Sequence, residues 1–181
     1  IVFSPKRWLV PSSIAELQDA IAANRKVRIA GSRHSFNNIV DSNETIVSTD
    51  NLNRVINIDG DAMTVLVEGG ARYGDLATTI ERKGFALANL ASLPHISIAG
   101  AVATATHGSG VGNGNLATAV TELQLITADG TLATFSRASH PNEFDGMVVN
   151  LGALGAIATL KLRVEPTYQI CQQVFCHVPL G

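Results

Sequence analysis

The stretch Val27-Arg28-Ile29-Ala30-Gly31-Ser32-Arg33-His34-Ser35-Phe36 decides the fold. Its first residues predict a strand, and Gly31 ends that strand and opens a turn of small and polar residues. Gly31 has no side chain and that of Ser32 is short, so the backbone here is accessible. Several of its N–H groups can point to one side and form a concave site for an anion such as a pyrophosphate. His34 then places an imidazole at the edge of this concave site. The alternative interpretation is a tight strand-to-loop turn with an ordinary polar histidine, because short glycine motifs have many chance matches.

Length and composition limit the classes of protein to which this chain can belong. The 181 residues suit one ordinary domain or two small lobes. With 46% hydrophobic and 15% charged residues, a disordered chain is excluded. The net charge of -2 gives no case for nucleic acid or an anionic membrane surface, and we expect neither partner. No apolar run reaches the roughly 18 residues of a membrane span. The only cysteines, Cys171 and Cys176, exclude a disulfide scaffold and favour a cytoplasmic protein.

Periodicity and turn signals predict the elements on either side of the opening stretch. Ser13 and Glu16 form a capping box at the start of a helix that runs to Asn24. In the first third we expect strands over 26–30, 45–48, 55–58 and 63–68 around one small sheet, the last two joined as a hairpin by Asp59-Gly60-Asp61. Gly69-Gly70 breaks the pattern, which predicts lobe one at about 1–69 and lobe two at about 70–181.

The second part of the chain predicts a further hairpin and several helices. Asp129-Gly130 is a strong hairpin turn. The expected elements are helices over 73–83 and 142–150, the hairpin strands over 120–128 and 131–135, a strand over 158–164 and a last strand over 169–174.

The segment from Leu90 to Gly108 consists almost entirely of small residues and hydroxyls, without Asp, Glu, Lys or Arg. Small side chains let a flat ligand approach the backbone, and hydroxyls supply donors. A tightly packed helix–helix contact is the alternative. The glycine-rich loop over 108–115 lacks the lysine and Ser/Thr of a Walker sequence, so we interpret it as a mobile surface loop. His34, His95 and His107 leave open a metal site, although their spacing matches no compact signature.

Three phrases carry a resemblance to a known family: "LASLPHISIAGAVATATHGSG" over 90–110, "TADG" over 127–130 and "LGALGAI" over 151–157. With the Gly-Ser-Arg-His-Ser-Phe turn, they resemble the flavin-binding domain of the vanillyl-alcohol oxidase/p-cresol methylhydroxylase family. The match is closest to its bacterial alditol (xylitol) oxidase branch, with sugar-lactone oxidases as cousins. The resemblance covers essentially the whole chain. It implies an α+β, two-lobed FAD-binding domain with a small N-terminal α/β lobe and a larger lobe of antiparallel sheet and helices.

The resemblance also implies a cofactor and its contacts. FAD is expected, bonded covalently through its 8α-methyl group to His34. The expected cofactor-binding residues are Ile29, Ala30, Gly31, Ser32, Arg33, His34 and Ser35 around the pyrophosphate, Ser92, Ser97, Gly100, Ala101, Val102, Ala103 and His107 along the flavin and its phosphates, and Ala156 and Ile157 near the adenine. Arg33 stands where many relatives carry glycine, which puts the local turn geometry in question because arginine takes a positive φ less freely.

The activity implied is oxidation of a polyol such as xylitol or sorbitol to an aldose, by hydride transfer to the flavin, with O2 reduced to H2O2. Ser92 is the candidate catalytic residue in this sequence, and no metal is expected. The main catalytic residues are expected in a C-terminal substrate domain that this sequence does not contain, so the chain alone is expected to be inactive. A sugar-lactone oxidase or dehydrogenase, or a non-catalytic flavin-binding fragment, is the alternative.

Overall fold

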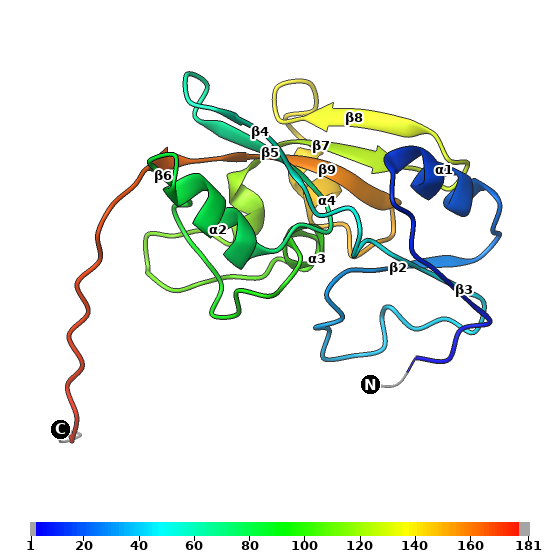
Figure 1. The fold of residues 1–181 in the computed structure, drawn as a ribbon, viewed down its shortest axis with the longest axis horizontal. Helices are drawn as coiled ribbons and strands as arrows, with labels where there is room; N and C mark the ends of the chain where they lie inside the picture. The colour runs from blue at the N-terminus through cyan, green and yellow to red at the C-terminus, as the bar shows by residue number, and fades with distance from the viewer. Residues whose placement is uncertain (1–2, 178–181) are drawn as a thin grey trace.

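Two β-sheets and the helices around them form the body of the molecule, which a computed structural model describes over residues 3–177 (Figure 1). The smaller sheet is parallel, with strand order β1-β3-β2, and the larger is antiparallel, with strand order β4-β5-β9-β7-β8. The strands are β1 Arg7–Leu9, β2 Val27–Ala30, β3 Thr45–Ser48, β4 Val55–Asp59, β5 Thr64–Glu68, β7 Val120–Ile126, β8 Leu132–Ser136 and β9 Ala156–Arg163. The helices are α1 Ile14–Ala22, α2 Tyr73–Glu81, α3 Ile98–Ala103, α4 Phe144–Val148 and the 3₁₀ turn η1 Leu116–Ala119, and β6 Phe85–Ala86 pairs with β10 Glu165–Pro166.

The small sheet and α1 form as the sequence predicts, with one addition. Ser13 caps α1, and its Oγ accepts a hydrogen bond from the Glu16 N–H at 3.1 Å. The Glu16 carboxylate accepts from the Ser12 N–H at 2.7 Å, one residue earlier than in a standard capping box. The addition is β1, which the sequence analysis missed; it pairs in parallel with β3.

The hairpin β4–β5 corrects the prediction that the first third of the chain forms one small sheet. These two strands belong to the large sheet, where β5 pairs with β9 from Thr64 opposite Arg163 to Glu68 opposite Thr159. The chain therefore passes from one sheet to the other between Ser48 and Val55, before Gly69-Gly70. A two-stranded hairpin is marginal by itself, and pairing with a third strand lets its apolar face join a larger core.

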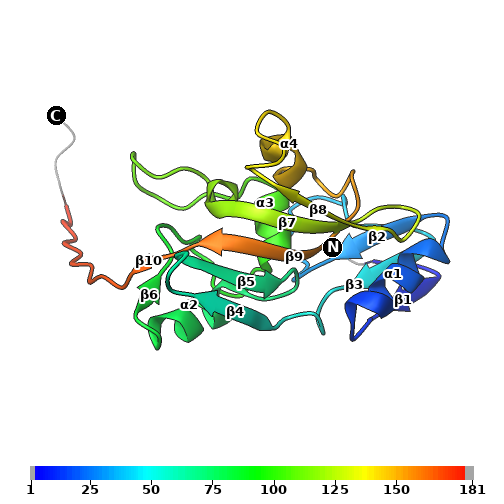
Figure 2. The same cartoon turned by 90° about the horizontal axis from the view of Figure 1, so that it is seen from above.

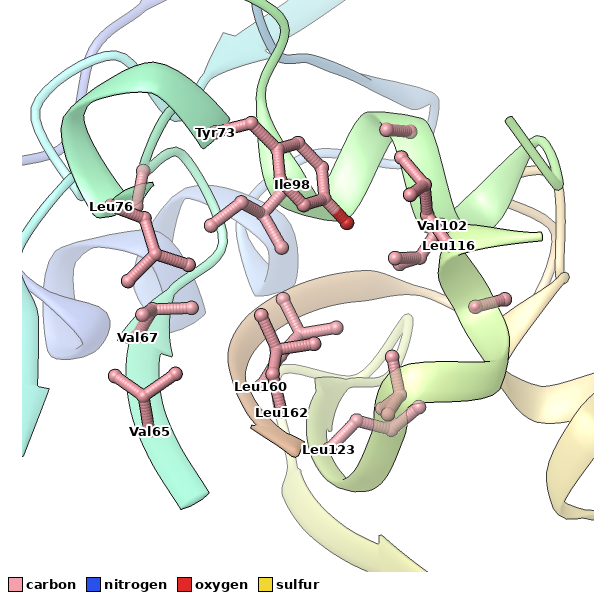
Figure 3. Packing of buried hydrophobic residues seen from close by; sticks show 14 of the residues in the cluster. Val65, Val67, Tyr73, Leu76, Ile98, Val102, Leu116, Leu123, Leu160 and Leu162 are labelled. Atoms are coloured by element: carbon pink, nitrogen blue, oxygen red, sulfur yellow. The ribbon is translucent and has the colours of Figure 1, made fainter. Parts of the chain in front are cut away.

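The main core lies between the large sheet and the helices α2, α3 and α4, which lie together on one face of it (Figure 1). Val67, Leu160 and Leu123 of the sheet meet Leu76 of α2 and Val102 of α3, all nearly inaccessible to solvent (Figure 3). Residues Ile126, Ala156 and Ala158 of the sheet pack instead with α1 in a second, smaller core, and part of the other face carries polar side chains. There the ion pair of Lys161 with Glu122 joins β9 to β7 at 3.0 Å.

One carboxylate is buried at the end of β5. The side chain of Glu68 is fully inaccessible, while Arg54 reaches it from the surface with Nη2 at 2.7 Å from Oε1. The Arg54 backbone N–H donates to the other carboxylate oxygen at 2.8 Å. Burial by itself raises the pKa of Glu68, but the hydrogen bonds and charge of Arg54 outweigh it and hold the pKa below its ordinary value.

The last strand predicted, over 169–174, is wrong. Beyond β10 the described chain has no further strand and extends away from the body (Figures 1 and 2). Ile170 and Val174 are 80% and 74% exposed. Alternating apolar residues favour a strand, but a strand forms only by pairing with another, and residues 169–174 pair with none of the described strands. Cys171 and Cys176 lie in this segment as exposed free thiols.

Within residues 3–177 there is also no helix with the length and apolarity that crossing a membrane requires.

Candidate cofactor-binding site

A cavity of about 700 Å³ brings together the three stretches that the sequence analysis singled out. Its walls come from residues 28–40, which leave β2, from residues 91–107, which include α3, and from residues 150–157, which enter β9. Thr49 completes the lining after β3. The volume lies in the range of sites that enclose a small molecule or cofactor. Segments far apart in the sequence therefore build one site.

The turn after β2 is fastened to the start of α3 by two reciprocal hydrogen bonds. The Ser32 N–H donates to Ser97 Oγ at 3.3 Å, and the Ser97 N–H donates to Ser32 Oγ at 3.0 Å. Gly31 is required beside this pair, because a Cβ there would lie 2.1 Å from Ser97 Oγ. We call this pair the Ser32–Ser97 contact. It fixes the turn against the small-residue wall of the cavity.

Arg33 adopts the conformation that the sequence analysis questioned. Its φ is +59°, so this arginine takes the left-handed backbone otherwise typical of glycine. Its guanidinium lies 3.4 Å from the Asp50 carboxylate and 5.8 Å from the centre of the Trp8 ring. Successive residues of opposite backbone hand turn their N–H groups to one side, which creates an anion-binding concavity. In the described chain the N–H groups of residues 33–35 donate to no protein acceptor, so they are available to a bound anion.

Small residues form a second wall of the cavity, next to the turn. Gly100, Ala101, Ala103 and Ala105 line the cavity in and just after α3. A Cβ added to Gly100 would meet only the Ser97 hydroxyl within 4 Å. These small side chains leave the backbone accessible from the cavity.

The third wall is a loop whose backbone is held by Asn150. The buried Asn150 side chain donates to the Met147 carbonyl at 2.8 Å and accepts from the Gly152 N–H at 2.7 Å. Leu151 has a φ of +54° and Gly155 a φ of +144°. A Cβ on Gly155 would lie 2.2 Å from the Ile126 carbonyl oxygen, so only glycine fits there. Asn150 was not among the residues expected in the site, although a polar residue before the apolar run over 151–157 was a usable signal.

Most residues expected to bind the cofactor line this cavity. They are Ile29, Gly31, Ser32, Arg33, His34, Ser35, Ser92, Ser97, Gly100, Ala101, Ala103, His107, Ala156 and Ile157. Ala30 and Val102 do not: both side chains are fully buried behind the lining, in the sheet and in the core. Phe36, Thr49 and Asn150 also line the cavity and were not among the expected residues. The glycine-rich loop over 108–115 does not line this cavity.

The histidines do not form the alternative metal site. His34 and His107 line the cavity, whereas His95 lies outside it. His107 Nδ1 is 2.9 Å from the Gly108 carbonyl oxygen, which fixes that nitrogen as the donor. Across the described range, 3–177, no three side chains of His, Cys, Asp or Glu are grouped to hold a metal ion.

The charge and shape of the cavity fit a dinucleotide such as FAD. The lining contains Arg28 and Arg33 and no acidic side chain, so nothing there repels a pyrophosphate. The free N–H groups after Ser32 suit phosphate oxygens. The small-residue wall suits a planar ring. Comparison with known proteins decides between this and other anionic ligands: residues 5–136 match the model of a family described as FAD binding domain.

The chain belongs to this family of FAD-binding domains.

The relatives that the chain matches are named as oxidases and dehydrogenases. The chain is 43% identical to an alditol oxidase of Streptomyces sp., over 99% of its own length and 44% of the relative's. It is 32% identical to the L-gulonolactone oxidase of Mus musculus, over 95% of the chain and 40% of the relative. It is 35% identical to an L-gulono-1,4-lactone dehydrogenase of Mycobacterium tuberculosis, over 93% of the chain and 40% of the relative. This FAD-binding domain thus spans less than half the length of these relatives, and the resemblance inferred from the sequence is confirmed.

Proposed function

We propose that this chain is the FAD-binding part of an oxidoreductase that oxidises a CH–OH group of a polyol and reduces O2 to H2O2. The observation that carries the proposal is the cavity described above, whose walls are the turn after β2 and the alditol-oxidase-like stretches over 90–110 and 151–157. The similarity to an alditol oxidase over nearly the whole chain supports a polyol as substrate. Bound FAD supplies the hydride acceptor and the route of electrons to O2.

The chain's own residues have distinct roles in this proposal. The N–H groups of Arg33, His34 and Ser35 bind the pyrophosphate, held in place by the Ser32–Ser97 contact. The wall of Gly100, Ala101 and Ala103 packs against the flavin. His34 forms a covalent bond to the 8α carbon, which keeps the cofactor attached through every turnover. Ala156 and Ile157 contact the adenine end, and His107 contributes a polar contact.

Ser92 is the proposed substrate-side residue. It lines the cavity and is exposed, so its hydroxyl can reach a ligand above the flavin. We propose that the other substrate contacts come from a further domain, since the relatives are more than twice as long as this chain. Positioning of the carbinol carbon depends on those contacts, so the 181 residues alone should turn over polyols poorly.

A sugar lactone is the second candidate substrate, because relatives named for gulonolactone and arabinonolactone match over more than nine-tenths of the chain. The test compares the chain with a protein extended through the further domain, matched for bound flavin, on xylitol, sorbitol and a gulonolactone. We expect peroxide release by the extended protein on the polyols. Release on the lactone alone would assign the second candidate, and colourless protein that takes up no FAD would refute both.

A further inference from the structure

His95 lies against the ring of His34 from outside the cavity. The two imidazole centroids are 5.3 Å apart and the ring planes make an angle of 82°, an edge-to-face contact. The ring of Phe36 makes a similar contact with His34, at 5.4 Å and 73°. Among the residues that the structure describes, neither imidazole has a hydrogen-bond partner. The orientation of the His34 ring therefore depends on these two aromatic neighbours.

The backbone that carries His95 is held firmly. The Pro94 carbonyl accepts from the Gly74 N–H at 2.8 Å, and the Ile96 carbonyl accepts from the Tyr73 N–H at 3.2 Å. Ile96 is buried in the core. These bonds tie both sides of His95 to the start of α2, which packs on the large sheet. His95 is thus a fixed support, whereas His34 stands on an exposed turn.

We propose that His95 is a positioning residue that turns the His34 imidazole so that one ring nitrogen faces the flavin. The inference rests on the covalent attachment in the proposed function. Without a packing partner, an exposed histidine distributes over several staggered side-chain rotamers. Each rotamer that points the nitrogen away from the 8α carbon lowers the rate of bond formation, because such steps require close and aligned atoms. The perpendicular geometry indicates ring packing rather than proton transfer between the two imidazoles, since no hydrogen bond joins them.

Covalent attachment of FAD to His34 is an oxidation in which O2 is the electron acceptor. A neutral imidazole nitrogen of His34 forms a bond to the 8α carbon, and one C–H bond of that methyl group and the imidazole N–H bond are broken. The two hydrogens leave as two protons and two electrons. O2 accepts them and becomes hydrogen peroxide. His95 takes no part in this exchange and acts only on the orientation of His34.

The test measures attachment itself. Apoprotein from riboflavin-starved cells is mixed with FAD in air, and the intact mass of acid-denatured samples gives the fraction of covalent adduct over time. We expect His95→Ala to slow attachment about tenfold or more, because a misplaced nucleophile reacts less often. His95→Phe, which keeps an aromatic edge or face but no nitrogen, should stay within about twofold of the wild type. His140→Ala is the matched control, because His140 makes the same kind of contact with Phe135 at 5.2 Å and does not line the cavity.

The outcomes separate this inference from the proposed function. Attachment at the wild-type rate in His95→Ala overturns the inference while leaving the covalent bond intact. Equal slowing in His95→Ala and His95→Phe overturns positioning by ring packing and assigns the effect to the imidazole nitrogens. A wild-type chain that binds FAD but never gains its mass refutes the covalent bond, and the inference with it. Non-covalent FAD affinity and the unfolding midpoint, measured for each variant, should match the wild type because His95 is exposed and outside the cavity.

Discussion

Replacing Gly31 with alanine should break the Ser32–Ser97 contact. The added Cβ would lie 2.1 Å from Ser97 Oγ and 3.1 Å from Ser97 Cβ. Gly31 does not have a positive φ, so alanine adds no backbone strain of its own. The Ser97 hydroxyl must rotate away, and the Ser32 N–H loses its acceptor.

The size of the effect follows from that lost hydrogen bond. A part-buried N–H without its acceptor costs about 1–3 kcal/mol, and we expect Gly31→Ala to lower the free energy of unfolding by this amount. Ser97→Ala removes the same hydroxyl and should cost a similar amount. Once the hydroxyl is gone, the new Cβ meets only the residue 97 Cβ. Adding Gly31→Ala to Ser97→Ala should therefore cost no more than about 0.5 kcal/mol, a strongly non-additive pair.

Urea unfolding of the four proteins of this cycle, followed by Trp8 fluorescence and circular dichroism, measures these values. Gly146→Ala in α4 is the control, because a Cβ there meets nothing within 4 Å. It should leave stability unchanged or raise it by up to about 1 kcal/mol, the usual gain for alanine over glycine in a helix. Additive effects of Gly31→Ala and Ser97→Ala would refute the steric reasoning.

Two further predictions concern the cavity wall and the buried carboxylate. Ala103→Leu places a larger side chain in the cavity and should weaken FAD binding more than about tenfold, while the free energy of unfolding changes by less than about 1.5 kcal/mol. Titration of the protein with FAD by calorimetry measures the affinity. An unchanged affinity would mean that Ala103 only packs within the protein. Because the pKa of Glu68 is depressed in the fold, its stabilisation is present above the unfolded pKa of about 4.3 and is lost as the pH falls through the folded pKa. Arg54→Met removes the side chain that lowers this pKa, so burial should raise it instead. Thermal unfolding across a pH series should then show the largest loss of stability near neutral pH, where the buried carboxylate is charged and has lost the Arg54 side chain, and a smaller loss as the pH falls and Glu68 is protonated.

Local signals predicted most single elements but not which sheet they join. The capping residues of α1 and the turn at Asp129-Gly130 act within a few residues, so their helix and hairpin could be located. The membership of β4 and β5 in the large sheet depends on β9, about 100 residues later, and no local pattern encodes that pairing. β1 was missed because Arg7–Leu9 is too short to show alternation.

The kinds of residue that line the cavity could be predicted from the sequence, whereas the contacts and backbone conformations of these residues could not. The glycine and hydroxyl content of the turn after β2 indicated an anion site. That Ser97 would use its hydroxyl to hold Ser32, and that Arg33 would take a left-handed backbone, depend on contacts across the cavity. Asn150 was not predicted because its side chain forms hydrogen bonds only with the backbone of its own loop.

The place of β9 has a consequence for how this protein is made. It is the last long strand within residues 3–177, yet it lies in the middle of the large sheet, between β5 and β7 (Figure 2). Until the ribosome has added β9, the two flanking hairpins have no common partner, and the cavity lacks its third wall. Sheets that wait for distant pairings fold slowly and expose their edges meanwhile. Nascent chains should therefore stay protease-sensitive and unable to retain FAD until Arg163 has left the exit tunnel.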